Sequence, residues 1–582
     1  MSCHWVASSK SGTGLSVVVV VADIREISVK GVSLRVGDAV CKAGRCRRFD
    51  FLGVAGTFHK CFVEIPVPTA VNVPTFADFS RLAVEGGVGA VVPVYRTLLA
   101  DHLTPVTAYE RLSTRGEHSF LLESVVGGER VARYSFSGVA PKRVIKAYDK
   151  RVTIEERHGT KVIDTRTFAS SDPLKELEKL HAANKGVKVP GLPSFAGGLV
   201  GFAGYDTVRY LEGEKLKGMP KDDRHLPDML FGQYDELVIF DHVNKTIIVV
   251  ANAHITDMGA DKVRLAYDDA VASIEEIIAT LQKQMPFTLG EIDRNAELRP
   301  KYTSNFTRDG FEKAVLAAKE YIKAGDIFQV VLSQRLETTT SARPFDIYRA
   351  LRVVNPSPFM FYVTSPECIL IGSSPEIMCR VQDGVITNRP IAGTRKRGKD
   401  EAEDVALEKD LLADPKERAE HIMLVDLGRN DVGRAAELGS VKITDTMIVE
   451  RYSHVMHIVS NVEGKLASDK SVFDAMRLAL PVGTVSGAPK IRAMQIIDEL
   501  EPTKRGPYAG AVGYVDYNGN LDTCIALRTM VVIPDGVDAN RVYVQAGAGL
   551  VADSVPESEY QETINKAAGL LKAVAIAEAG LT

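Results

Sequence analysis

Hairpin patterns and helical patterns are interleaved along most of this chain. Apolar segments flank the dipeptides at 383–384 (Asp-Gly) and 518–519 (Asn-Gly), which favour tight β-hairpin turns. Between such hairpins, stretches such as 309–324 and 557–577 space their apolar residues as a helix does. Because hairpins join antiparallel strands, the pattern predicts an α+β fold with largely antiparallel sheets, not a doubly wound parallel sheet.

The length of 582 residues predicts more than one domain, or one unusually large one. Residues 286–306 contain two prolines and many polar side chains, so we place a boundary or a long connection there. The two predicted parts of the folded chain are therefore 75–285 and 300–580.

Residues 1–65 differ in composition from the rest. They hold four of the seven cysteines, the only tryptophan, nine basic residues and five acidic ones, with serines near the start. An excess of basic residues and serine over acids is typical of an organelle transit peptide. We therefore expect a disordered presequence that directs the protein to a plastid stroma, with a cytoplasmic location as the alternative. The apolar run 15–22 could instead be a secretory signal core or a strand.

The overall composition excludes several classes of protein. A net charge of −4 argues against a nucleic-acid-binding surface. No Cys/His spacing suggests zinc, and no apolar run reaches the roughly 20 residues that span a bilayer. Cys368, Cys379 and Cys524 lie in apolar surroundings and read as buried thiols in a reducing compartment.

The stretch 479–500 (ALPVGTVSGAPKIRAMQIIDEL) reads as a strand end, a glycine-rich loop and a helix. Gly483 and Gly487 allow a tight turn and a close approach to a ligand, and Pro489 suits the first position of a helix. A loop of this kind before a helix N-terminus can bind an anion, because free N–H groups and the helix dipole both favour negative charge. An ordinary connection between two elements is an equally good interpretation of these residues alone.

Two predicted helices each carry a pair of carboxylates three residues apart, and so on one face. The pairs are Glu417 with Glu420 and Glu559 with Glu562. If the two helices met, four carboxylates would suit a hard cation such as Mg²⁺. Taken singly, each pair is more typical of a solvated charged face.

Several basic residues are candidates for a site. His457 lies in an apolar strand pattern, where a core role is common but a neutral imidazole can also act as a general base. Arg528 is predicted within the strand 523–533, where its charge needs an anionic partner, either a substrate carboxylate or an internal acid. Arg395 and Arg397 follow a Gly-Thr turn and present the same two alternatives.

The glycines of 545–552 (QAGAGLVA) fit a loose dinucleotide fingerprint, which we reject because no helix follows.

Taken together, the motifs resemble the chorismate-utilising enzymes, and within them the large subunits of anthranilate synthases. The similarity runs from about residue 75 to the C-terminus. It rests on LLES at 121–124, PSPFMFYV at 356–363, GSSPE at 372–376, RPIAGTRKRG at 389–398, AEHIMLVDLGRNDVGR at 419–434, VMHIVSNVEG at 455–464, PVGTVSGAPK at 481–490, GPYAGAVGY at 506–514 and QAGAGLVADSVPESEYQET at 545–563. The resemblance implies two intertwined α/β layers around one active site, with 75–285 as the N-terminal regulatory part and 300–580 as the chorismate-binding part.

The resemblance also implies roles for individual residues. Glu376 matches the general acid that protonates the departing 4-hydroxyl of chorismate, and His457 matches the residue needed for the loss of pyruvate. The substrate-binding positions are Gly393, Thr394, Thr484, Tyr508, Arg528, Gly547, Ala548, Gly549 and Lys566, and Thr484 also belongs to the catalytic group. Glu420 and Glu562 match the Mg²⁺ ligands, with Glu417 and Glu559 beside them. Ser124, Pro358, Phe359 and Met360 match a tryptophan feedback site.

Two positions distinguish the subfamilies. Relatives that make aminodeoxychorismate carry a lysine nucleophile where this chain has Ala392, and isochorismate and salicylate synthases carry a water-activating lysine where it has Gln329. The resemblance therefore implies a lyase that makes anthranilate and pyruvate from chorismate and ammonia, the first committed step of tryptophan biosynthesis. It implies a separate glutamine-amidotransferase subunit, in a heterotetramer of two large and two small chains. The alternatives are an aminodeoxychorismate synthase and a non-catalytic tryptophan-sensing homologue.

Overall fold

The computed structural model describes residues 26–29, 32–35, 72–124, 133–285, 290–293, 300–451, 455–536 and 538–580. The chain divides into two units, 1–71 and 72–582. In the first unit, strands β1 (Glu26–Val29) and β2 (Val32–Arg35) form an antiparallel hairpin. The rest of the predicted presequence, including the run 15–22, lies outside the described residues.

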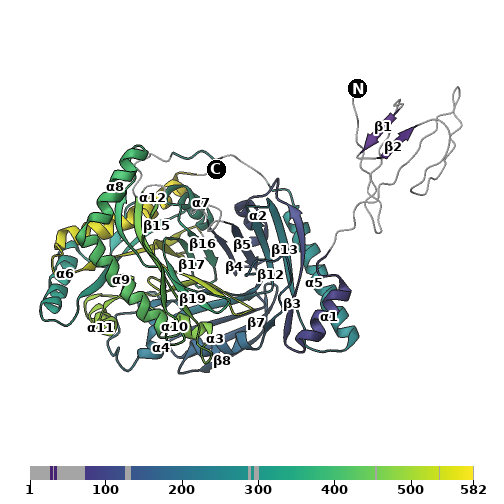
Figure 1. Ribbon diagram of the computed structural model, residues 1–582, viewed down its shortest axis with the longest axis horizontal. Helices are drawn as coiled ribbons and strands as arrows, with labels where there is room; N and C mark the ends of the chain where they lie inside the picture. The colour runs from purple at the N-terminus through teal and green to yellow at the C-terminus, as the bar shows by residue number, and fades with distance from the viewer. Residues whose placement is uncertain are drawn as a thin grey trace. The chain divides into compact units, whose positions relative to one another are not determined.

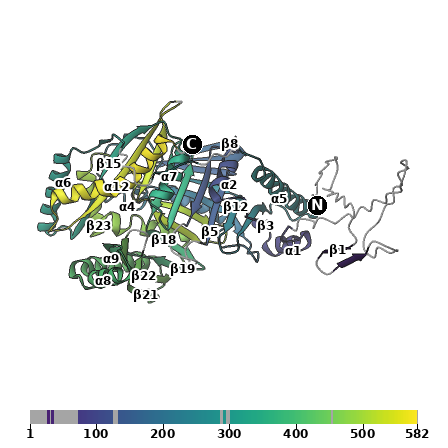
Figure 2. The same ribbon diagram turned by 90° about the horizontal axis from the view of Figure 1, so that it is seen from above.

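The second unit is built on two large β-sheets with helices packed around them (Figures 1 and 2). In spatial order, sheet I consists of β14 (Thr303–Ser304), β15 (Gln329–Thr340), β27 (Asn540–Leu550), β26 (Thr529–Pro534), β17 (Ile369–Ser374), β16 (Phe359–Thr364), β4 (Ser119–Glu123), β5 (Tyr134–Val139), β12 (Glu236–Asp241), β13 (Thr246–His254), β3 (Ala90–Leu99) and β9 (Lys185–Gly186), with β23 (Gly487–Ala488) paired to β15. Sheet II consists of β20 (Ile391–Lys396), β22 (Val455–Lys465), β19 (Val385–Asn388), β18 (Ile377–Gln382), β25 (Leu521–Ile525), β24 (Ala511–Asp516), β10 (Gly198–Ala203), β11 (Met229–Tyr234), β6 (Arg143–Tyr148), β7 (Arg151–His158) and β8 (Lys161–Ala169), with β21 (Lys442–Arg451) paired to β22.

The helices cover the two ends and the faces of these sheets. They are α1 (Phe76–Gly86), α2 (Pro105–Ser113), α3 (Pro173–Ala182), α4 (Arg209–Glu212), α5 (Ala260–Leu281), α6 (Arg308–Lys323), α7 (Pro344–Val354), α8 (Glu401–Ala413), α9 (Pro415–Gly433), α10 (Val472–Ala479), α11 (Lys490–Leu500) and α12 (Pro556–Ala579), with 3₁₀ turns η1 (Tyr205–Val208) and η2 (Gly483–Val485). Helices α1 and α5 lie at the opposite end of this unit from α6 and α8 in both views (Figures 1 and 2). Sequence patterns located most of these helices to within a few residues, because their apolar faces pack on the sheets.

The pairing of the strands confirms the predicted α+β class and the two-layer antiparallel arrangement. Among the described strands, only β3 and β9 pair in parallel. Both predicted parts, 75–285 and 300–580, contribute strands to both sheets, and 72–582 forms one compact unit. The two parts are therefore intertwined and share one core, as the resemblance implied.

Neighbouring strands pass from one sheet to the other at the same place, and this seam fixes two candidate site residues. The chain leaves β17 in sheet I and enters β18 in sheet II through Glu376. Strand β25 pairs with β18 and strand β26 pairs with β17, and between β25 and β26 the chain crosses back from sheet II to sheet I through Arg528. The amide of Ile525 donates to the Glu376 carbonyl at 3.0 Å, and the amide of Ser373 donates to the Arg528 carbonyl at 3.1 Å. The two crossings are thus hydrogen-bonded to each other.

Two local sequence predictions were wrong. The predicted strand 523–533 is two strands in different sheets, and Arg528 lies in the connection between them, with a left-handed backbone at φ 47°. The helical spacing of 472–479 correctly predicts α10, so the strand end read at the start of 479–500 was wrong, and Pro489 is the N-cap of α11, one residue before the helix begins. Both errors arise where short apolar segments fit more than one element, so that tertiary pairing decides.

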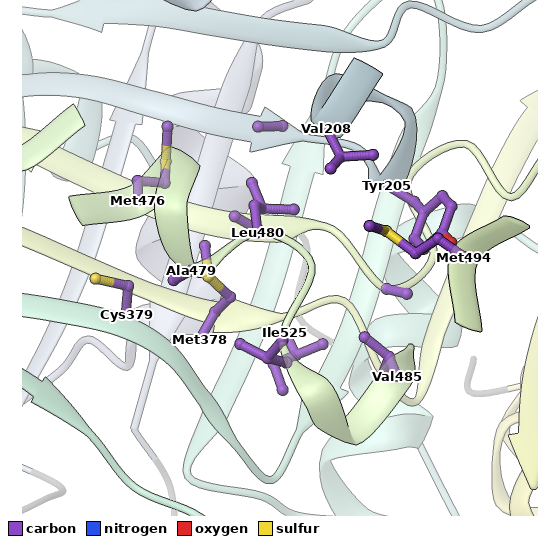
Figure 3. Packing of buried hydrophobic residues seen from close by; sticks show 14 of the residues in the cluster. Tyr205, Val208, Met378, Cys379, Met476, Ala479, Leu480, Val485, Met494 and Ile525 are labelled. Atoms are coloured by element: carbon purple, nitrogen blue, oxygen red, sulfur yellow. The ribbon is translucent and has the colours of Figure 1, made fainter. Parts of the chain in front are cut away.

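The largest core cluster packs α10 and the glycine loop against sheet II. Figure 3 shows Met476, Ala479 and Leu480 gathered with Met378 and Cys379 of β18. Burial of these apolar side chains is the main favourable term that holds the loop in place.

A fully buried ion pair crosses this core. Arg505 and Glu501 are 2% and 4% exposed, and their charged groups meet at 2.6 Å. Arg505 also donates to the carbonyls of Val485, in the glycine loop, and Val331, in β15, each at 2.7 Å. Glu501 in turn accepts from the amide and hydroxyl of Ser333. A buried charge pair is tolerated only when its remaining polar atoms are satisfied in this way.

We predict that Arg505→Ala strongly destabilises the fold. The variant leaves the Glu501 carboxylate buried without its cation, which costs about 3–5 kcal/mol. The midpoint of urea-induced unfolding measures the effect. Arg541→Ala is the matched control, because Arg541 pairs with Asp535 at the surface and its removal should shift the midpoint little. Equal shifts for the two variants would contradict a structural role for the buried pair.

Candidate active site

Glu376 lies at the seam between the two sheets and is 6% exposed. The Thr484 hydroxyl of the glycine loop donates to its Oε1 at 2.9 Å, so two residues predicted as catalytic are in direct contact. Among the described residues, only Thr484 acts on the charge of this carboxyl. Burial raises the pKa of Glu376 to about 8, and the Thr484 hydrogen bond opposes the shift in part. Glu376 therefore carries a proton at neutral pH and can act as a general acid.

The glycine loop is held by the protein on both sides. Gly487 has a φ of 139°, and a Cβ there would lie 2.2 Å from the backbone oxygen of Gln329, so the close approach predicted for this glycine is to strand β15. Short strand β23 separates the loop from helix α11, so the helix N-terminus does not directly extend the loop. Gly483 and Thr484 thus present a rigid turn beside Glu376.

His457 is on β22 opposite Thr394 of β20. Its Nδ1 lies 3.0 Å from the Gly393 carbonyl and 3.1 Å from the Thr394 hydroxyl. A carbonyl can only accept, so the proton resides on Nδ1, and Nε2 is the nitrogen that can take up another proton. Burial lowers the pKa of His457, with the Gly393 hydrogen bond opposing and the Arg528 charge adding to the effect. The imidazole is therefore neutral, as a general base must be.

Arg528 brings a positive charge to the same seam. Among the described residues it makes no ion pair, unlike Arg395, which pairs with Asp410 and Asp414, and Arg397, which pairs with Asp404. The partners of Arg395 and Arg397 are therefore internal acids and not a substrate carboxylate. Burial lowers the pKa of Arg528, and the charges of Tyr508 and Glu562 oppose that shift. A half-buried guanidinium without an internal carboxylate is suited to a substrate carboxylate.

The predicted glycines Gly547 and Gly549, with Ala548 between them, lie on β27 beside β15. A Cβ on Gly547 would approach the Tyr508 hydroxyl to 2.9 Å, and one on Gly549 would approach the Gln329 amide nitrogen to 2.8 Å. The side chains of Tyr508 and Gln329 therefore fill part of the space that is free because these glycines have no side chain. Gln329 is 5% exposed, and its amide oxygen is without a hydrogen-bond partner among the described residues.

The carboxylates predicted on two helices approach one another. On α9, the pKa of Glu420 is raised by partial removal from water and then by the charges of Glu417 and Glu562, the latter on α12. Lys566 donates to Glu562 at 2.6 Å and to the Gly547 carbonyl at 2.9 Å, which ties this region to β27. The pKa of Glu559 is raised by burial, and its Ser554 hydrogen bond opposes the shift. Glu417 instead contacts Arg395 at 3.5 Å.

This donor set fits Mg²⁺ in composition. In the described part of the chain, no three His, Cys, Asp or Glu side chains are close enough together to hold a metal ion. Mg²⁺ needs only one or two protein carboxylates, because water and substrate oxygens complete its octahedron. The mutual repulsion that raises the pKa of Glu420 is what a bound cation would relieve.

The four residues predicted as a tryptophan site come together on sheet I. Strands β4 and β16 pair with Glu123 opposite Met360, so Ser124 at the end of β4 lies beside 358–360. The Ser124 hydroxyl is buried and has no hydrogen-bond partner among the described residues. Phe359 is half-buried and Pro358 is buried.

The sequence analysis missed a second group of polar residues. A cavity beside Glu376 and Thr484 is also lined by Asn388 and Asp431, and Asp431 is bonded to Lys490 at 2.6 Å. Both charged residues fall within quoted motifs, GRND and GAPK. A charged residue that is buried would have marked this group as functional, but the sequence does not show which charged residues are buried.

Comparisons with known proteins show the family of this chain. A family described as chorismate binding enzymes matches residues 117–572. The chain is 47% identical to anthranilate synthase component 1 of Acetivibrio thermocellus, over 83% of this chain and 95% of the relative. It is 46% identical to the chloroplastic anthranilate synthase alpha subunit 1 of Arabidopsis thaliana, over 89% and 90%.

Solved structures give the same fold. Anthranilate synthase component I of Streptococcus pneumoniae superposes with a TM-score of 0.65 at 38% identity, covering 81% of this chain and 99% of that one. The menaquinone-specific isochorismate synthase of Escherichia coli has a TM-score of 0.59 at 19% identity, covering 86% and 99%, and shares the fold. No helix among the described residues is long and apolar enough to cross a membrane.

We predict that Glu376 makes stability fall with pH over a defined window. Its pKa is about 8 in the folded protein and 4.5 ordinarily, so the folded state alone keeps the proton between these values. Its stabilising contribution is complete below about pH 4.5 and falls by roughly 1.4 kcal/mol per pH unit until about pH 8. Glu376→Gln does not titrate.

Unfolding of wild type and Glu376→Gln in urea from pH 5 to 9.5 measures this window. The free energy of unfolding of the wild type should decline relative to that of the variant up to about pH 8 and then stay level. A difference that is constant across the range would mean that Glu376 is ionised throughout.

Proposed function

Because this chain belongs to the chorismate-binding enzyme family, we propose that it converts chorismate and ammonia to anthranilate and pyruvate, as the large subunit of an anthranilate synthase. The observation that carries the proposal is that the adjacent sheet crossings hold a protonated acid, Glu376, and a guanidinium, Arg528, which has no ion pair among the described residues and whose charge acts on the neutral base His457. The enzyme is a lyase. The transferase alternative needs a lysine amine at the position of Ala392, and none is there.

Separate residues of the site bind the substrate, orient the acid and transfer protons. Arg528, Tyr508 and the backbone of Gly547 to Gly549 hold the substrate carboxylates, and the Gly483–Thr484 turn supports the same end of the substrate. Thr484 keeps the Glu376 carboxyl in one orientation. Glu376 protonates the 4-hydroxyl as it leaves and ammonia adds at C2, and His457 then removes the C2 proton as pyruvate departs.

Glu420 and Glu562 would hold Mg²⁺, with Glu417 and Glu559 beside them. When bound, the ion would act as a Lewis acid on the ring carboxylate and draw electron density from the diene. Lys566, which bridges Glu562 and the Gly547 carbonyl, keeps the helix carboxylates next to the substrate-binding strand.

The ammonia would come from glutamine, through a separate amidotransferase subunit bound to this chain, in a heterotetramer of two large and two small subunits. The proposal rests on the family and on the relatives' designation as components or subunits. A plastid stroma is the proposed location, supported by the basic composition of 1–65 and by the chloroplastic relatives.

We also propose that tryptophan binds beside Ser124 and inhibits the enzyme. The unpartnered Ser124 hydroxyl offers a hydrogen bond to a ligand, and Phe359 and Met360 offer apolar contact for an indole ring. The site is on sheet I, where Phe359 pairs with Ser374 at the end of β17 next to the seam.

Incubation of the full chain with chorismate, ammonium and Mg²⁺ tests the activity. We expect blue-fluorescent anthranilate and an equal amount of pyruvate, and we expect EDTA to abolish the reaction until Mg²⁺ is restored. Accumulation of aminodeoxychorismate without pyruvate would refute the lyase assignment. Absence of any chorismate turnover would favour a non-catalytic sensing role.

We expect Ser124→Phe to raise the tryptophan concentration for half-inhibition by about tenfold or more, since a phenyl ring fills the space beside 358–360. Turnover without tryptophan should change less than about twofold, because the substitution replaces none of the residues assigned to the reaction. Ser341→Phe, at an exposed serine, is the matched control and should leave inhibition unaltered. Unchanged inhibition in Ser124→Phe would remove Ser124 from the regulatory site.

A further inference from the structure

A polar cavity lies behind the catalytic acid. Glu376, Thr484, Asn388 and Asp431 line it on the polar side, and Leu424 and Leu427 of α9 close it. Asn388 and Asp431 are 9% and 4% exposed, so both side chains belong to the interior. A small buried space with several polar groups is the kind of site in which proteins hold ordered water.

The proposed reaction requires the catalytic acid to be protonated again after each turnover, and the inference below rests on that proposed function. In each turnover the Glu376 O–H bond breaks and the proton goes to the 4-hydroxyl oxygen, which leaves as water with the electrons of its C–O bond. Ammonia forms the new C2–N bond with its lone pair, and the resulting ammonium group passes one proton to solvent water, which balances the proton given up by Glu376. Glu376 is left as a buried carboxylate that must regain a proton before the next cycle. Since its side chain is only 6% exposed, the cavity offers a route for that proton which does not pass through the substrate-binding space.

Asp431 is the second carboxyl on the cavity, and it has a link towards the surface. Its Oδ1 accepts from Lys490 Nζ at 2.6 Å, and the Lys490 side chain is 11% exposed. Lys490 is the first residue of α11, and its ammonium also reaches the Ala479 carbonyl at 3.4 Å. Burial raises the pKa of Asp431, while the charges of Lys490 and Arg434 lower it. Because these effects on its pKa oppose each other, the Asp431 carboxyl can both take up and release a proton.

We propose that Asp431 and Lys490 return the proton to Glu376 through water held in this cavity. The proton moves from the Asp431 carboxyl to water as water passes one of its own protons to the Glu376 carboxylate. Asp431 is recharged from the solvent side, where Lys490 keeps it oriented. Asp431 is thus a relay residue that acts through Glu376 and does not touch the substrate.

The test compares wild type with Asp431→Asn in the ammonium-dependent reaction of the full chain. The amide keeps the shape and can still accept from Lys490, but it cannot carry a proton. We expect kcat to fall by about tenfold or more, with the KM for chorismate within about twofold, because only the return of a proton is slowed. The solvent deuterium isotope effect on kcat should rise, since proton return then limits turnover. Asp426→Asn, at an exposed carboxylate on the same helix, is the matched control and should alter neither value.

Asp431→Asn also leaves the Lys490 ammonium without its anion and could unfold the protein. The double variant Asp431→Asn/Lys490→Met removes both charges and should restore the melting temperature while kcat stays low. A stably folded variant that keeps the wild-type kcat overturns the relay, and so does a slower variant with an unchanged isotope effect, which would indicate positioning alone. If wild type itself makes no anthranilate, it is the proposed function that fails.

Discussion

The candidate active site depends on neighbouring antiparallel strands that change sheets at one place. The crossing from β17 to β18 and the reverse crossing from β25 to β26 are held together by two backbone hydrogen bonds, one to the Glu376 carbonyl and one to the Arg528 carbonyl. Strands within a sheet expose side chains to its two faces, whereas a residue at a crossing belongs to neither face. The crossings therefore place an acid and a guanidinium in the seam between the sheets. The N-terminal half has a comparable pair of crossings, from β5 to β6 and from β11 to β12, although the sequence shows no repeat.

The seam can hold charge because nearby charges are paired and satisfied. Arg505 and Glu501 form a buried pair that fastens the glycine loop to β15, and Asp431 and Lys490 fasten α9 to α11. Glu376 differs from these residues, since no cation among the described residues pairs with it and it keeps its proton. His457 is in the opposite situation, because burial removes its charge. One environment thus maintains an acid and a base at the same pH, which is how a single site can run both halves of an elimination.

The sequence alone predicted much of the local structure. Hairpin dipeptides located β18–β19 and β24–β25, and helical spacing located α5, α6 and α12 nearly to the residue, because these elements carry their own periodicity. It also named the site residues, although most roles came from resemblance to a family and not from the residues themselves. It could not reveal that 523–533 is divided between two sheets, because a continuous apolar run gives no sign of where a strand ends and the next begins.

What the sequence determined by itself was the inventory: an antiparallel α+β chain, with an alanine at 392 and a glutamine at 329 in place of lysines. Those identities remove the lysine nucleophile at 392 and the water-activating lysine at 329, whatever the fold does. Only the tertiary structure decided which charges were neutralised. Arg395 and Arg397 found internal carboxylates and Arg528 did not, while Glu420 and Glu562 approached each other from separate helices. Proton affinity depends on burial and on neighbouring charge, and both are properties of distant segments brought together by folding.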